Sequence, residues 1–335
     1  MGYIMIIIAL TLMITTHEFG HFIAGKLLKV PVYEFSIGMG PLIWSKQGKK
    51  ETKYSLRLLP IGGYCAFDKG DATGVQDMEL NKYSVGKRII IFAAGAFLNL
   101  LSALIISIFL CGCIGLPKTT TTIESISSEE TDAFLQVGDT IVNINGVDVE
   151  NNFSKLSEAI SLKDDGTANI IINRNGKQLE SDINLVKSGD SYFLGISVRS
   201  EYSKSKGLNA FTDGFNYFIA NAIAIFMSLG QLISGKVGIN QMSGIVGIVS
   251  IVGSAAKQNM LNLITYYIML SANLGIFNLL PIPPLDGSKI LFCLYEAIFK
   301  KRIPSKIEEN ITLIFVTLFI LLMIVITFSD IIKLF

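Results

Sequence analysis

Charge is scarce in this sequence, and histidine is scarcer still. Charged residues make up 16% of the 335 residues, half of the composition is apolar, and only two histidines occur. Soluble domains carry about 25% charged residues, so this composition excludes an ordinary soluble protein and indicates an integral membrane protein. The net charge is only +1, and we expect no nucleic-acid partner.

Cysteine patterns that would indicate a structural metal or a disulfide framework are also lacking. The four cysteines, Cys65, Cys111, Cys113 and Cys293, have neither zinc-ribbon nor disulfide-framework spacing, so we interpret them as small core residues. The first apolar stretch lacks a positively charged leader region and a small-residue cleavage site. We therefore expect it to be a spanning helix and not a secretory signal.

Four apolar stretches are near or above the roughly 20 residues that a spanning helix requires. They cover about residues 3–28, 89–116, 259–299 (an interrupted stretch) and 311–332. A polar block separates the second stretch from the third. It is followed by an amphipathic segment with helical periodicity, which we expect to lie along the membrane surface.

The distribution of charge predicts an orientation. Residues 26–88 hold 11 Lys/Arg against 6 Asp/Glu, whereas residues 117–258 hold 11 against 15. The loop that begins at Lys300, "KKRIPSK", is basic too. By the positive-inside tendency, both basic regions face the cytoplasm and the polar block faces outward.

Both histidines occur in one short motif, "HEFGH", inside the first apolar stretch. On a helix, His17 and His21 lie on one face and can bind one metal ion, while Glu18 points about 100° away, where it can act as a general base. Zinc suits this arrangement, because a catalytic zinc usually has three protein ligands and one open position. Chance can produce such a motif, but an ionisable group inside a membrane segment indicates function.

The third ligand must come from elsewhere, because the chain has no other histidine. A cysteine could serve, but a carboxylate is the natural partner, and the 259–299 region contains one aspartate, Asp286, in "NLLPIPPLDGSKILF". Prolines just before it prevent a continuous helix, and irregular backbone at membrane depth is tolerated only when buried in protein or lining a cavity. The alternative is that Asp286 merely caps the helix that follows.

Together, "HEFGH", "NLLPIPPLDG" and the polar block between them resemble the site-2 protease family of intramembrane zinc metalloproteases, in its bacterial branch that regulates envelope stress. The resemblance covers essentially the whole chain. It implies that His17, His21 and Asp286 bind Zn²⁺ and that Glu18 is the catalytic acid/base.

The stretch "FSIGMGPLIWSKQGKKETKYSLRLLPIGGY" is similar to the membrane-reentrant β-hairpin of that family, here residues 35–64. Its "KYSLRLLP" segment alternates like a strand, and Gly62 and Gly63 suit a tight turn. An exposed strand edge could hold an unwound substrate by β-augmentation. An ordinary amphipathic hairpin on the cytoplasmic face is the alternative.

Three asparagines are candidates for substrate binding. "AAGAFLNLL" is similar to a Gly-x-x-x-Asn element of the family and supplies Asn99, although Ala96 stands where proline is common. Asn273 and Asn278 lie in "ANLGIFNLLP". The resemblance implies that this pair binds the substrate backbone near zinc, and hydrogen bonding between helices is the alternative for all three.

The polar block resembles a PDZ domain at about residues 117–200, with short alternating strands, an "ING" turn and one amphipathic helix. It lacks a clear "GLGF" carboxylate loop, so we expect a filter against bulky substrates and not a tight binder of peptide ends. Peptide recognition is the alternative.

The sequence thus predicts an α-helical membrane protein with about four spanning helices, a reentrant β-hairpin and an inserted PDZ-like α+β domain. The predicted parts are a membrane domain (1–116), the PDZ-like domain (117–200), an amphipathic membrane-surface segment (201–258) and a second membrane domain (259–335). We expect a multi-pass protein of the cytoplasmic membrane, with its active site near the cytoplasmic side and the PDZ-like domain outside.

The predicted function is intramembrane zinc endopeptidase. By resemblance, the substrates are single-pass membrane proteins such as anti-sigma factors, or signal-peptide remnants, cut after an upstream first protease, and the other partners are membrane lipids. The alternatives are a transporter that binds ions at the same residues and a PDZ-bearing sensor with a structural zinc site. Hydrolysis needs a base at Glu18, and we see no internal repeat of the kind that transporters often show.

Overall fold

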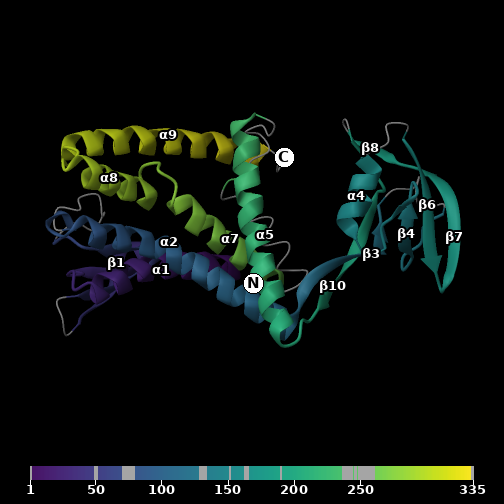
Figure 1. Ribbon diagram of the computed structural model, residues 1–335, viewed down its shortest axis with the longest axis horizontal. Helices are drawn as coiled ribbons and strands as arrows, with labels where there is room; N and C mark the ends of the chain where they lie inside the picture. The colour runs from purple at the N-terminus through teal and green to yellow at the C-terminus, as the bar shows by residue number, and fades with distance from the viewer. Residues whose placement is uncertain are drawn as a thin grey trace. The chain divides into compact units, whose positions relative to one another are not determined.

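The computed structural model describes residues 2–48, 52–69, 80–127, 134–150, 152–161, 166–188, 191–235, 244, 247 and 261–332. The chain forms two compact units, one from Met1–Phe109 and Phe211–Phe335 and the other from Leu110–Ala210 (Figure 1). The first unit contains the long helices and the β-hairpin, and the second contains the larger sheet and a short helix.

Long apolar helices dominate the first unit. They are α1 (Gly2–Leu27), α2 (Val85–Phe109), α5 (Leu208–Ile233), α7 (Leu261–Asn278), α8 (Asp286–Phe299) and α9 (Ser305–Ile332), with a short 3₁₀ turn, η1 (Leu80–Lys82), before α2. Helix α7 ends just before the proline-rich segment, because proline removes a backbone donor and clashes with the preceding turn. Helix α8 ends at Lys300, which has φ 55 and donates its N–H to the Glu296 carbonyl.

Four helices in the described part of the chain are long and apolar enough to cross a membrane. These candidate spans are Met5–Leu27, Val85–Ile114, Leu208–Leu232 and Ser305–Phe328. Three correspond to predicted spans. The 259–299 region is instead divided into α7 and α8, neither of which is among the four, because Pro281, Pro283 and Pro284 interrupt it.

The segment expected on the membrane surface contains α5, which by length and composition can cross a membrane. Helix α5 has the lowest mean hydropathy of the four candidate spans, and its placement on the membrane surface stays a prediction. The rest of the segment, residues 236–258, lies outside the described residues except for 244 and 247.

Helix α2 is the central element of the first unit and packs against α1, α7 and α8. Glycines allow these close approaches. A Cβ at Gly20 on α1 would collide with the Ala94 carbonyl of α2, and a Cβ at Gly275 on α7 would lie 3.0 Å from the Ala96 carbonyl oxygen. Small residues at helix contacts are typical of packing in membranes, and here they bring three helices around one point.

The predicted β-hairpin is present as β1 (Glu34–Gln47) and β2 (Lys53–Ala66). Its pairing is more complex than a simple hairpin, because Glu34–Ile37 pairs with Lys53–Leu56 in parallel and with Gly63–Ala66 antiparallel. Large apolar side chains on both strands are exposed, at Met39, Leu42, Ile43, Trp44, Leu58 and Leu59.

The prediction that Gly62 and Gly63 form the turn is wrong, because both lie within β2. Gly62 has φ +95, a conformation that other residues rarely adopt. A Cβ at Gly63 would lie 2.8 Å from the Ser36 carbonyl oxygen of β1. The glycines therefore permit an irregular, tightly paired strand.

The second unit is an α+β structure. Its six-stranded sheet has the order β10-β3-β4-β6-β7, with β5 paired to β4. The elements are a π-helical turn (Leu110–Ile114), β3 (Leu116–Ile126), β4 (Thr140–Ile144), β5 (Val147–Asp148), α4 (Phe153–Ser161), β6 (Thr167–Arg174), β7 (Lys177–Asn184), β8 (Val186–Ser188), β9 (Ser191–Phe193) and β10 (Ile196–Ser203). Strands and α4 share one apolar core. The first and last strands of the second unit, β3 and β10, pair antiparallel.

Candidate metal centre

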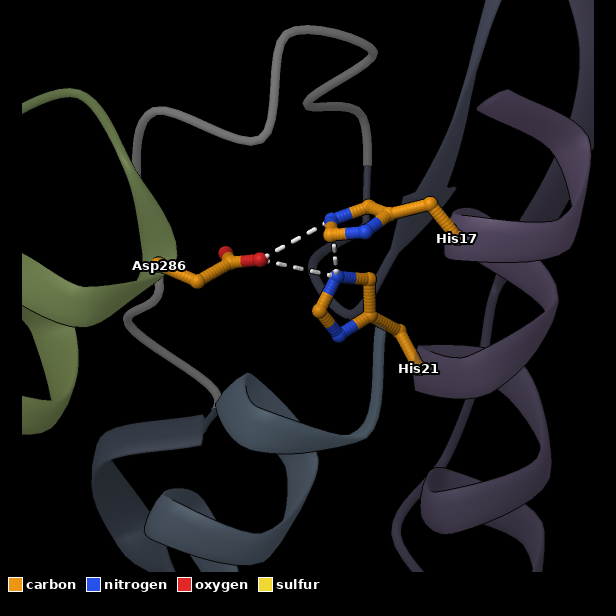
Figure 2. Close-up of side chains that lie close together, drawn as sticks. All are labelled: His17, His21 and Asp286. Carbon is orange, nitrogen blue, oxygen red and sulfur yellow. Dashed lines mark hydrogen bonds and ion pairs between the residues drawn. The ribbon is translucent and has the colours of Figure 1, made fainter. Parts of the chain in front are cut away.

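Three side chains from opposite ends of the chain converge on one point in the first unit. His17 and His21 project from successive turns of α1, and Asp286 projects from the first residue of α8 (Figure 2). The Asp286 Oδ2 atom lies 3.0 Å from His17 Nε2 and 3.2 Å from His21 Nε2. The two Nε2 atoms are 3.3 Å apart. Three predicted site residues are thus brought together.

This triangle of atoms fits a tetrahedral metal site. Zinc bonds of about 2.0–2.1 Å place neighbouring ligand atoms roughly 3.3 Å apart, close to the three separations seen here. Both imidazoles are buried, with His17 6% and His21 8% exposed. Two imidazole nitrogens that face each other and a carboxylate at such distances form a donor set suited to a shared divalent cation.

A backbone carbonyl orients one of the imidazoles. His21 Nδ1 lies 2.8 Å from the Ile91 carbonyl oxygen of α2. An Nδ1–H donated to this oxygen leaves the Nε2 lone pair directed at the triangle, which is how metal-binding histidines are usually fixed in one tautomer. His17 Nδ1 is buried without a hydrogen-bond partner among the described residues.

Asp286 does not cap its helix. The N-cap residue of α8 is Leu285, which makes no side-chain capping bond, while the Asp286 carboxylate faces the histidines. The next residue must be glycine, because a Cβ at Gly287 would collide with the carbonyls of Leu279 and Leu280. The backbone folds tightly here, and this turn brings Asp286 to the histidines.

Glu18 lies beside the triangle but is not part of it. It projects from α1 toward β2, where an ideal Cβ at Gly63 would lie 3.6 Å from Glu18 Cγ. The backbone N–H of Cys65 on β2 lies near its carboxylate. Glu18 therefore stands between the histidines and strand β2, in a position to act on a molecule held at both.

Sequence reasoning did not assign Gly95 to the metal centre. A Cβ at this position would lie 2.5 Å from His21 Nε2 and 2.8 Å from His17 Nε2. Gly95 thus leaves room for the ligand nitrogens. The only sequence feature that could have indicated this role is the spacing of one helical turn between Gly95 and Ile91. That spacing is informative only once it is known that α2 packs on α1.

We expect Gly95→Ala to weaken zinc binding by at least about tenfold, because its methyl group would displace both imidazoles from the ligand positions. Zinc affinity is measured by competition with a chelator. Gly86→Ala on the same helix is the matched control, since a Cβ there meets nothing within 4 Å. Equal affinity of the two variants would contradict the steric role of Gly95.

The three asparagines differ in their surroundings. Asn99 is fully buried, and both polar atoms of its amide lack a hydrogen-bond partner within the described part of the chain. The hydrogen bond between α7 and α2 at this point is donated by the Ser271 hydroxyl to the Asn99 backbone carbonyl, so the amide does not make the expected interhelical bond. Asn273 and Asn278 are half-buried on α7.

A buried set of two histidines and one aspartate, beside a glutamate and on apolar helices, defines a metal-dependent hydrolase of the membrane as the class of protein. The profile of Peptidase family M50 matches residues 5–323. The chain belongs to this family, that of the site-2 proteases, which confirms the resemblance seen in the sequence.

Curated relatives share its full length. A protein of Fusobacterium nucleatum is 30% identical over 100% of both chains. A protein of Campylobacter jejuni is 34% identical over 97% of this chain and 92% of its own. Both names describe zinc metalloproteases. The chain is a zinc metalloprotease of the membrane, and the prediction of Zn²⁺ as its cofactor is confirmed.

Proposed function

We propose that this metalloprotease cleaves peptide bonds within or near the spanning segments of single-pass membrane proteins, such as anti-sigma factors, or of signal-peptide remnants. One observation carries the proposal. His17, Glu18 and His21 lie within a helix that is long and apolar enough to cross a membrane. A protease whose site is built into such a helix acts on peptide that reaches the same depth.

We assign His17, His21 and Asp286 as the zinc ligands and Glu18 as the general base. Zinc, when bound, supplies a Lewis acid for the scissile carbonyl and lowers the pKa of a bound water to about 7. Glu18 takes a proton from the attacking water and returns it to the leaving amine. The Ile91 carbonyl holds the His21 imidazole in place for this chemistry.

Strand β2 is the proposed substrate clamp. A helical substrate hides its amides in its own hydrogen bonds, so it must unwind before cleavage, and a strand beside Glu18 can hold it extended. Gly63 lets the backbone of β2 approach Glu18 without a side chain in the way. Gly62 and Gly63 are both proposed to contact the substrate. The exposed apolar side chains of β1 and β2 favour insertion of the hairpin into the membrane. Asn273, Asn278 and the amide of Asn99 are proposed to bind substrate backbone.

We place the site near the cytoplasmic face of the cytoplasmic membrane and the second unit, which we interpret as PDZ-like, outside. The basic residues of the regions 29–88 and 300–310 support this orientation. The enzyme would act in regulated intramembrane proteolysis, after a first protease has shortened the substrate.

Mass spectrometry of membranes tests the substrate class. Cells with the wild-type protein are compared with cells that carry Glu18→Gln. We expect shortened single-pass fragments to accumulate in the variant, with their outer domains already removed. Identical membrane peptide profiles in the two strains, with both proteins equally abundant, would contradict the proposal.

Removing the second unit should relax selectivity while leaving zinc bound. Residues 118 and 201 pair across β3 and β10, so the excised ends lie side by side and a short Asn-Gly link can join them. We expect the shortened enzyme to cut an untrimmed substrate that the full-length enzyme rejects, because a folded domain no longer blocks its approach. The ratio of rates for trimmed and untrimmed substrates is the measurement.

An unrelated soluble domain of similar size, inserted at the same point, is the control for this deletion. If bulk alone excludes substrates, this insertion restores the discrimination. A deletion variant with the wild-type ratio of rates would contradict the filter and favour peptide recognition or a structural role.

A further inference from the structure

An ion pair formed by a buried arginine joins the two helices that complete the metal centre. Arg88, in the first turn of α2, is 4% exposed, and its Nη2 lies 2.8 Å from Glu296 Oε2 in the last turn of α8. Arg88 Nη1 also lies 3.5 Å from Asn81 Oδ1. The pair thus fixes the end of α8 that is farthest from Asp286.

Both helices of this pair carry groups of the metal centre. Ile91 and Gly95 follow Arg88 on α2 by about one and two turns, and Asp286 is at the other end of α8 from Glu296. Between these points, Ile290 and Cys293 of α8 belong to the same apolar cluster as Ile91 and Phe92 of α2. Helix α8 is therefore seated along the helix that orients His21.

Helix α8 depends on such lateral contacts for its placement. Residues 279–285, which connect it to α7, are not helical, so α7 does not extend into α8 as one rigid rod. A metal site tolerates displacements of only about 0.5 Å in its ligands. The contacts of α8 with α2 must supply that accuracy for Asp286.

We propose that Arg88 and Glu296 are positioning residues that align Asp286 with His17 and His21 by fixing α8 on α2. This proposal adds positioning residues to the metal site and therefore rests on the proposed function. Arg88 is buried, its partner Glu296 is 23% exposed, and Glu296 belongs to the same helix as Asp286. A pair that only added surface stability could lie anywhere on the unit.

A second arginine offers a matched control. Arg302 also bonds Glu296, with Nε 3.1 Å from the same Oε2 atom. It lies in the loop after α8, and its side chain is 38% exposed, against 5% for Arg88. Removing Arg302 deletes a cation from the same carboxylate, together with its hydrogen bond to the Asn81 carbonyl, but leaves the direct ion pair between α2 and α8 in place.

The test is a double-mutant cycle read as zinc affinity of the full-length protein in detergent. We expect Glu296→Gln and Arg88→Met each to weaken zinc binding about tenfold in the wild-type background. In the Asp286→Ala background we expect the same changes to have no further effect, because their influence passes through Asp286. Arg302→Met should leave the zinc affinity unchanged in each background, compared with the protein of that background that keeps Arg302.

The cobalt-substituted enzyme provides a second reading. We expect the visible absorption of fully loaded Glu296→Gln to shift from that of wild type, since a displaced Asp286 changes the coordination geometry, while Arg302→Met keeps the wild-type spectrum. Equal losses of affinity in both backgrounds, with unchanged cobalt spectra, would overturn the inference. If Arg88→Met fails to accumulate, Glu296→Gln, which keeps an oxygen acceptor, decides the question alone.

The result separates this inference from the function itself. If Asp286→Ala loses zinc but the effects of the two changes simply add in the double-mutant cycle, the positioning role is rejected and the assignment of the zinc ligands stands. Full zinc affinity in Asp286→Ala would reject the ligand set first, and the positioning role with it.

Discussion

Glu18→Gln is expected to abolish peptide-bond cleavage while leaving one zinc bound per chain. The amide keeps the size of the side chain and can still accept a hydrogen bond, but it cannot take a proton from water. General-base catalysis contributes about 10²–10⁴-fold to the rate, so the cleavage rate should fall by at least this factor. Turnover of a purified substrate in detergent, with zinc measured in the same sample, checks both parts.

The matched control is Glu309→Gln, an equally conservative change at an exposed carboxylate on α9. It should leave the rate unchanged. If Glu18→Gln retained normal turnover, Glu18 would not be the base, and another group near the three ligands would have to take its role.

Asp286→Ala is expected to lower zinc affinity by well over about tenfold and to stop cleavage, because the site loses one of three protein ligands. Ser288→Ala is the informative control. The Ser288 hydroxyl donates to the Leu285 carbonyl at the start of α8, so its removal disturbs the same helix start without touching the ligand set. Comparable zinc loss in both variants would attribute the effect to the helix start and not to the carboxylate.

The sequence predicted well those site residues that a short local motif identifies. The i, i+4 spacing of His17 and His21 follows from helix geometry alone. Asp286 could be found because an aspartate in an apolar stretch broken by prolines is unusual. These two local signals, 269 residues apart, were enough to name the three residues that converge at the metal centre.

Features that depend on which elements pack together were not predictable. The roles of Gly95 and Ile91 require α2 to lie against the histidine face of α1. The double pairing of Glu34–Ile37 depends on how β2 bends, which alternation of side chains does not encode. Helix α5 is long and apolar enough to cross a membrane although asparagines and Asp213 lower its hydropathy, so its composition alone does not decide between a spanning and a surface helix.

The distance along the chain between the histidines and Asp286 has a consequence for biosynthesis. Helix α1 leaves the ribosome early, but its two histidines gain their third partner only after α8 has been inserted, 269 residues after His17. During translation the chain thus carries two of its three proposed zinc ligands and no complete site. On this assignment, hydrolytic competence arrives only with the last 50 residues of the protein, so a chain that stalls before them cannot cut its neighbours in the membrane.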